Sequence, residues 1–227
     1  LCAQALHKVR LAQGRADGVT IVVVPTVSLA LDQARTVSQM LGHPCDYVGG
    51  SSDDVRQQNA DIRHRVRAGT QGMVFTAPES LLGSLRPAVY EAATNGYLKA
   101  LVIDEVHLVD QWGVEFRPSF QMLAGLRRKL LETSPPPAPV TVLLSATITQ
   151  SSYDTIAGLF SGPGALEVVP AVTLRPEPEV WTYECSCDEE KQQRLEEAIR
   201  HVPRPAIVYT TEVRRANALS QRLRAIG

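Results

Sequence analysis

The feature that most constrains the fold is a short apolar run that ends abruptly in two acids. Leu101, Val102 and Ile103 are typical of a strand buried on both faces of a parallel sheet, and Asp104 and Glu105 follow them directly. Open α/β sheets bind ligands beyond the carboxyl ends of their strands. Two carboxylates at that edge suit a hydrated Mg²⁺ ion and an attacking water. A solvated strand end without a ligand is the alternative that these residues alone leave open.

Short apolar strands alternate with helices along most of the chain. The predicted strands are 19–24, 73–75, 101–103 and 142–144. The predicted helices are 1–14, 27–41, 52–68 and 118–131, with Ser52 as an N-cap and Gly14, Gly42 and Gly69 as stops. The proline-rich stretch 134–139 is predicted to be a loop. A strand that is followed each time by a helix predicts an α/β fold, in which a parallel sheet carries helices on both faces.

The pattern changes after Phe160. Stretches rich in glycine and proline at 161–164 and 175–178 interrupt it, and edge strands are expected at Leu166–Val169 and Val180–Cys185. The elements expected after them are a charged helix from 188, a buried strand at 205–209 and a helix at 211–226. A domain boundary is therefore expected in the region that follows Phe160.

Composition limits the class of protein more than it identifies the function. The chain has 227 residues, of which 44% are hydrophobic and 21% charged, and its net charge is −1. These values exclude a disordered chain, and no apolar run is long enough for a membrane span. With no overall basic field, a nucleic acid would have to be held by a local groove. The four cysteines form no pair of Cys-x-x-Cys motifs, so neither a zinc site nor a secreted disulfide framework is indicated, and a cytoplasmic location is expected.

The residues around and after the two acids match a known pattern. They are Asp104-Glu105-Val106-His107, followed by Gln111-Trp112-Gly113-Val114-Glu115-Phe116-Arg117-Pro118. This order resembles motif II and the aromatic-rich loop of RecQ-family DNA helicases, D-E-A-H and Q-W-G-x-x-F-R-P. Val106 in place of alanine is the one departure within the acid box. An aromatic residue and an arginine in such a loop can stack on bases and hold phosphate.

Four further segments resemble motifs of the same family. The segment after the first strand resembles motif Ia, with Thr26 where leucine is usual, and 76–80 resembles motif Ib, with Ser80 in place of arginine. Ser145-Ala146-Thr147 resembles motif III, and the region from 205 resembles motif IV at the start of a second RecA-like domain. The resemblance therefore implies a first RecA-like domain at 1–170, a linker at 171–187 and the start of a second such domain at 188–227.

The resemblance implies an ATP-dependent DNA helicase that acts in DNA repair or recombination and moves 3′ to 5′, with ATP and Mg²⁺ as cofactors and single-stranded and forked DNA as partners. Asp104 would hold Mg²⁺ through water, and Glu105 would activate the attacking water. His107 would couple nucleotide state to domain closure, together with Ser145, Ala146 and Thr147. The residues implied in DNA binding are Pro25, Thr26, Ser28, Gln33, Thr76, Pro78, Gln111, Trp112, Phe116 and Arg117.

Three elements of such a motor do not occur in this sequence. No G-x-x-x-x-G-K-[ST] string is present, and nothing resembles motif V or VI. The expectation is a chain that begins just after the phosphate loop and is inactive alone. Two other classes remain open: an RNA helicase of the DExH type, which the loop at 111–118 disfavours, and a non-catalytic RecA-like module that binds nucleic acid, which the two retained acids disfavour.

Overall fold

The computed structural model describes residues 18–111, 118–170 and 179–226. The chain divides into two compact units, the first ending at Val168 and the second beginning at Val169. In the described residues, the first unit holds the whole β-sheet and the second holds two helices.

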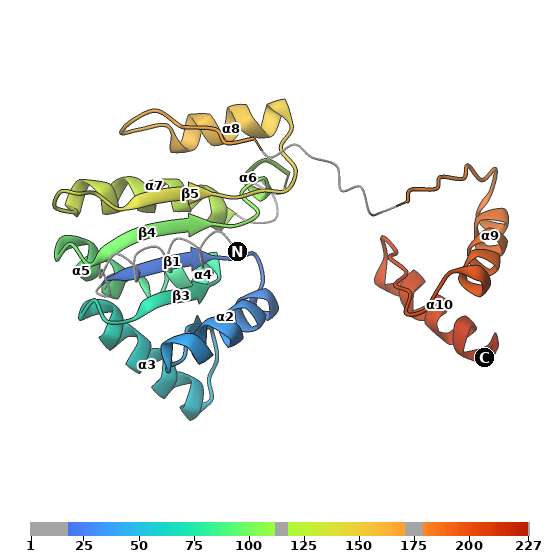
Figure 1. Cartoon of the computed structure of the whole chain (residues 1–227), viewed down its shortest axis with the longest axis horizontal. Coiled ribbons are helices and arrows are strands. Elements are labelled where there is room, and N and C mark those ends of the chain that lie inside the picture. Colours follow the sequence, from blue (N-terminus) through green and yellow to red (C-terminus); the bar gives the residue numbers. More distant parts are fainter. Residues whose placement is uncertain (1–17, 112–117, 171–178, 227) are drawn as a thin grey trace. The chain divides into compact units, whose positions relative to one another are not determined.

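The first unit is built on a five-stranded parallel sheet with the strand order β2-β3-β1-β4-β5. Val23 pairs with Thr76 on one side and with Ile103 on the other, and Ile103 pairs with Leu143. The carboxyl ends of four strands therefore lie side by side, and the arrowheads point to the same side in Figure 1. The strands are β1 (Val19–Val23), β2 (Asp46–Tyr47), β3 (Gly72–Thr76), β4 (Leu98–Ile103) and β5 (Val140–Leu143).

The helices of this unit begin and end where local capping groups occur. The Thr26 hydroxyl accepts a hydrogen bond from the Leu29 amide (3.3 Å), and the Ser52 hydroxyl accepts one from the Val55 amide (3.4 Å). Gly42 ends its helix with a left-handed φ of 73°. The helices are α2 (Val27–Leu41), α3 (Asp53–Arg67), α4 (Pro78–Leu82), α5 (Arg86–Thr94), α6 (Leu108–Gln111), α7 (Pro118–Thr133) and α8 (Gln150–Phe160).

Both faces of the sheet are covered. Because successive strand residues point to opposite faces, Ile21 and Val23 belong to one buried cluster, and Val22 and Val24 belong to the other. The first cluster includes residues of α3, α5, α7 and α8, and the second includes residues of α2. The predicted α/β fold, with helices on both faces of a parallel sheet, is confirmed.

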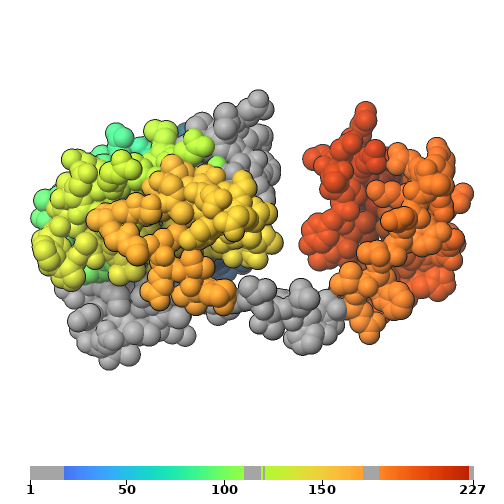
Figure 2. Space-filling model, turned by 90° about the horizontal axis from the view of Figure 1, so that it is seen from above, coloured from blue at the N-terminus to red at the C-terminus, as the bar shows by residue number. Residues whose placement is uncertain are grey.

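Three predicted strands are wrong. Leu166–Val169, Val180–Cys185 and Pro205–Tyr209 contain no strand, and the segment after α8 lies on the surface of the first unit (Figure 2). The segment Pro205–Tyr209, which was predicted to be a buried strand, is also exposed: the exposed fraction of Ile207 is 77%. A strand needs a neighbour for its backbone hydrogen bonds, and the described part of the second unit supplies none.

Five short or weakly patterned elements were not predicted: β2, α4, α5, α6 and α8. β2 has two residues and α6 has four, which is too short for a hydrophobic period to be recognised. The predicted helix at 1–14 lies outside the described residues.

The second unit consists of α9 (Asp188–His201) and α10 (Val213–Ile226), which were both predicted. The start of α9 is held by local contacts: the Ser186 hydroxyl and amide donate to the Glu190 carboxylate (2.7 and 2.9 Å), and the Glu190 amide donates to Cys187 Sγ (3.5 Å). The Arg194 guanidinium lies 4.9 Å from the centre of the Tyr183 ring. No helix in the described ranges is long and apolar enough to cross a membrane.

Candidate active site and nucleic-acid edge

The candidate site lies at the carboxyl edge of the sheet, where backbone hydrogen bonds continue past the strand ends. The Asp104 amide donates to the Val23 carbonyl and the Leu144 amide donates to the Ile103 carbonyl, both at 2.9 Å. The Val106 amide then donates to the Leu144 carbonyl, also at 2.9 Å. These bonds fix the turn that carries the two acids against the ends of β1 and β5.

The turn itself has an unusual backbone. Glu105 has a φ of 52°, and it is the one described residue other than glycine with a positive φ. Its amide donates to the Asp104 carboxylate (3.0 Å), and its carbonyl accepts from the Leu108 amide (3.0 Å). A left-handed glutamate costs free energy and persists only where its surroundings hold it, which is common at functional sites.

His107 links the acid turn to the segment after β5. Its Nδ1 lies 2.9 Å from the Ser145 hydroxyl and 3.2 Å from a carboxylate oxygen of Glu105. The Ser145 hydroxyl donates its hydrogen to the Thr147 carbonyl (2.8 Å). Because a carboxylate only accepts, and because the Ser145 hydroxyl gives its hydrogen to the Thr147 carbonyl, Nδ1 is the donor in both contacts.

The segment after β5 is compact and open to solvent. Besides donating to the Thr147 carbonyl, the Ser145 hydroxyl accepts from the Thr147 amide (3.3 Å). Ala146 and Thr147 are exposed. Two residues later, Thr149 caps α8 by accepting from the Ser152 amide (3.1 Å). Ser145 is therefore linked to the start of α8 by a short segment, so a movement of Ser145 would act on that helix start.

The predicted DNA-binding residues that the structure describes differ in exposure. Thr26 and Ser28 are exposed at the start of α2, while Pro25 and Gln33 are half-buried beside them. Thr76 has an exposed fraction of 0% and its hydroxyl donates to the Ala77 carbonyl (3.3 Å).

A side chain without exposed surface makes no contact with DNA, so the predicted contact of Thr76 is not made from its position in this structure. Pro78 is also buried and forms the first turn of α4. Gln111 ends α6. Trp112, Phe116 and Arg117 lie outside the described residues.

The chemistry of the acid turn fits Mg²⁺. Asp104 and Glu105 supply the hard carboxylate oxygens that this ion prefers, and the side chain of Glu105 is 36% exposed. Among the described residues, no group of three or more His, Cys, Asp and Glu side chains could enclose a metal ion. Mg²⁺ typically keeps several waters and is bound by one or two carboxylates together with substrate phosphates, which is compatible with this open turn.

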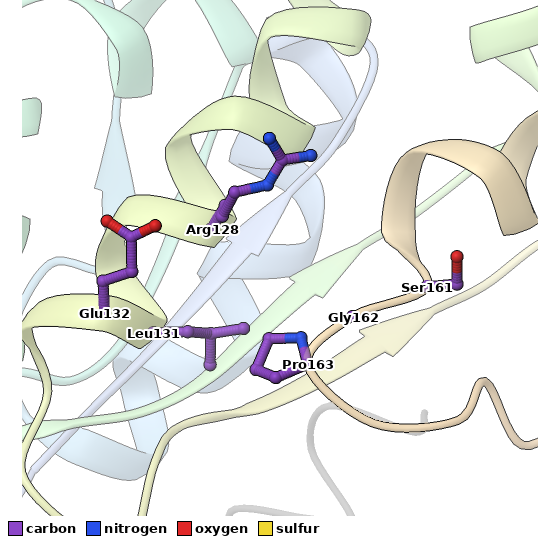
Figure 3. A pocket seen from close by; sticks show the side chains of 6 residues that line it. All are labelled: Arg128, Leu131, Glu132, Ser161, Gly162 and Pro163. Carbon is purple, nitrogen blue, oxygen red and sulfur yellow. The ribbon is translucent and has the colours of Figure 1, made fainter.

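Neither of two shallow pockets on the first unit includes a candidate site residue. One of about 310 Å³ lies between the end of α7 and the segment after α8, as Figure 3 shows. It is lined by Arg128, Leu131, Glu132, Ser161, Gly162 and Pro163. The other, of about 320 Å³, is lined by residues of α4, α5 and α7. The candidate site at the carboxyl edge of the sheet is thus separate from both pockets.

The chain belongs to the DEAD/DEAH box helicase family, whose family model matches residues 2–156. Within that family, it is similar to RecQ helicases. It is 30% identical to the ATP-dependent DNA helicase RecQ of Pasteurella multocida over 113 residues, which are 49% of this chain and 17% of that protein. It is 26% identical to the ATP-dependent DNA helicase RecQ of Bacillus subtilis over 212 residues, which are 92% of this chain and 33% of that protein.

The resemblance to RecQ helicases that the motifs indicated is confirmed by these relatives. The chain spans a third or less of the length of either one. In the crystal structure of the DUF1998 helicase MrfA bound to DNA, the matched fold covers 70% of this chain and 22% of that one, with a TM-score of 0.51 and 21% identity. That likeness shows the shared RecA-like fold.

Proposed function

We propose that this chain is part of a RecQ-type ATP-dependent DNA helicase that couples ATP hydrolysis to 3′-to-5′ movement on single-stranded DNA and to the unwinding of forked DNA in the cytoplasm. The observation that carries the proposal is the contact of His107 with both Glu105 and Ser145, because it joins the acid turn to the segment after β5. The similarity to RecQ helicases supports DNA as the nucleic acid.

The two acids take different roles. Asp104 would hold Mg²⁺ through water, and the bound ion would neutralise charge on the phosphate oxygens of ATP. Glu105 orients the attacking water and takes its proton, as a general base must lie within hydrogen-bond reach of that proton. The left-handed backbone of Glu105 supports this role, because it turns the second carboxylate away from the direction that a continued strand would give it.

His107 keeps Glu105 in place. Nδ1 of His107 lies within hydrogen-bond distance of both the Glu105 carboxylate and the Ser145 hydroxyl, so the ring restricts the rotamers of the general base. A movement of Ser145, Ala146 and Thr147 would change this contact. That connection is a physical route by which the state of the nucleotide site could be coupled to the segment that leads into α8.

DNA is proposed to run along the carboxyl edge of the sheet. Thr26 and Ser28 offer exposed hydroxyls for its phosphates, with Pro25, Gln33, Thr76 and Pro78 shaping the edge around them. Gln111, Trp112, Phe116 and Arg117 would detect the bases and the backbone. Because the net charge is −1, the affinity for DNA must come from such local contacts.

The test is the variant Glu105→Gln in the protein at its natural length. The amide is nearly isosteric with the carboxylate but cannot take a proton, so ATP turnover should fall by about 10² to 10⁴ while ATP and DNA binding are retained. Steady-state ATPase and equilibrium binding are measured side by side.

The matched control is Glu132→Gln, which removes an exposed carboxylate that pairs with Lys129 on α7. It should leave turnover unchanged. An ATPase of Glu105→Gln within a few-fold of wild type would refute the assigned role. A wild-type protein that binds DNA without any ATPase would favour the non-catalytic module.

A further inference from the structure

A hydrogen bond joins two helix starts that are far apart in the sequence. The Ser119 hydroxyl donates to a carboxylate oxygen of Glu79 at 2.8 Å, across 40 positions of the chain. Glu79 is the second residue of α4, the helix that follows β3 in the chain. Ser119 is the second residue of α7. α7 begins immediately after residues 112–117, which include Trp112, Phe116 and Arg117.

The Glu79 carboxylate brings a negative charge to the start of α7. The first turn of α7 contains no acidic residue, although the amides at a helix start favour a nearby negative charge. Glu79 brings such a charge from a different helix. In the described part of the chain, no lysine, arginine or histidine forms an ion pair with Glu79, so its contact with Ser119 does not compete with a salt bridge.

The two helices that this hydrogen bond joins also pack against each other in the core. α4 packs against α7, and Leu81 and Leu123 are buried in the same core cluster. The core thus packs the bodies of the two helices together, while the hydrogen bond joins their first turns at the surface. Losing a surface contact of this kind costs little stability, so the bond is better explained by what it orients than by what it stabilises.

We propose that Glu79 is a positioning residue that fixes the start of α7 against the segment after β3. This inference rests on the proposed function. The two segments that it joins are the predicted motif Ib, at one end of the DNA edge, and the helix that follows the predicted DNA-detecting loop. Through Ser119, Glu79 keeps DNA binding at the edge coupled to ATP turnover, and it touches neither ATP nor the attacking water.

The experiment uses the protein at its natural length and measures ATPase with and without saturating single-stranded DNA. Glu79→Ala and Ser119→Ala should each lower the DNA-stimulated rate about fivefold, as expected for loss of one solvent-exposed hydrogen bond of ordinary strength. The rate without DNA and the melting temperature should stay unchanged. The double variant should be no worse than either single one, because both remove the same contact.

Two further variants make the test specific. Glu79→Gln still accepts from the Ser119 hydroxyl but brings no negative charge, so its stimulation should lie between those of Glu79→Ala and wild type. Glu91→Ala is the matched control, since Glu91 is an exposed acid on α5 that pairs with Arg67 on α3 (3.0 Å), also between two helices of the first unit. It should retain full stimulation.

The outcomes separate this inference from the function on which it rests. Full stimulation in Glu79→Ala, or additive losses in the double variant, would overturn the positioning role while leaving the helicase proposal intact. A drop in the rate without DNA or in the melting temperature would overturn it in favour of a structural role. Wild-type ATPase that does not respond to DNA would overturn the proposed function and this inference with it.

Discussion

β1 of the first unit and the segment Pro205–Tyr209 of the second have similar sequences and different structures. β1 contains Thr20-Ile21-Val22-Val23, and the second segment contains Ala206-Ile207-Val208-Tyr209. β1 lies between β3 and β4, with Ile21 fully buried, whereas the second segment forms no strand and leaves Ile207 77% exposed. An apolar β-branched run can therefore form a strand, but it does so only where neighbouring strands pair with it.

The largest expected effect comes from truncating the two equivalent isoleucines. Ile21→Ala removes a buried side chain and should lower the free energy of unfolding by about 2–5 kcal/mol. Ile207→Ala removes an exposed one and should change it by less than about 0.5 kcal/mol. Urea denaturation followed by circular dichroism measures both. A loss above about 1 kcal/mol for Ile207→Ala would mean that this segment is packed in solution and that the contrast between the units is smaller than the structure shows.

Cysteine reactivity gives a second contrast between the units. Burial raises the pKa of the Cys45 thiol to about 11, whereas Cys187 is exposed at the start of α9. Since the thiolate is the reactive form, iodoacetamide at pH 8 should label Cys45 on the order of 100-fold more slowly in the native protein than in urea. Cys187 should change by less than about tenfold. Peptide mass spectrometry after timed labelling resolves the two sites, and native labelling of both at one rate would contradict the burial of Cys45.

The smallest effect concerns the local contacts that hold the second unit. Hydrogen bonds from the Ser186 hydroxyl and amide, and then from the Tyr183 hydroxyl, lower the pKa of Glu190 below its ordinary value of 4.5. A group whose pKa is lower in the folded state stabilises that state above its unfolded pKa, and this contribution is lost as the pH falls through the folded value. The start of α9 should therefore loosen at a pH below about 4.5.

A carboxyl NMR titration of Glu190 tests this expectation. Ser186→Ala should move the midpoint upward toward the ordinary value, because it removes the hydroxyl that contributes most to the shift. Ser151→Ala, on α8 of the first unit, is a control that should leave the midpoint unchanged. A wild-type midpoint at or above 4.5 would show that local hydrogen bonds do not hold the start of α9.

Much of the first unit was predictable because its signals are local. β1, β3 and β4 are short apolar runs, and the limits of α2 and α3 follow from Ser52 and Gly42, which act within one helical turn. The placement of Asp104 and Glu105 just beyond β4 was equally local, since a buried run that ends in two carboxylates marks the end of a strand. The roles of the site residues stay predictions until the variants are measured.

Other features depend on contacts between residues that are distant in the sequence. The contact of His107 with Ser145 spans 38 positions, and the bond of Ser119 with Glu79 spans 40. The burial of Thr76 also follows from the chain packed around β3. The hydrophobic pattern within a single helix or strand does not predict contacts between residues so far apart in the sequence.

The sequence by itself determined the parallel α/β class, most strands and helix limits of the first unit, and the pair of acids at a strand end, because period, capping and turn chemistry act over a few residues. Only the tertiary structure decided the strand order β2-β3-β1-β4-β5, the left-handed backbone of Glu105 and the absence of a strand at Pro205–Tyr209. Each of these depends on which backbone groups find partners from elsewhere in the chain, and that is settled when the elements pack together.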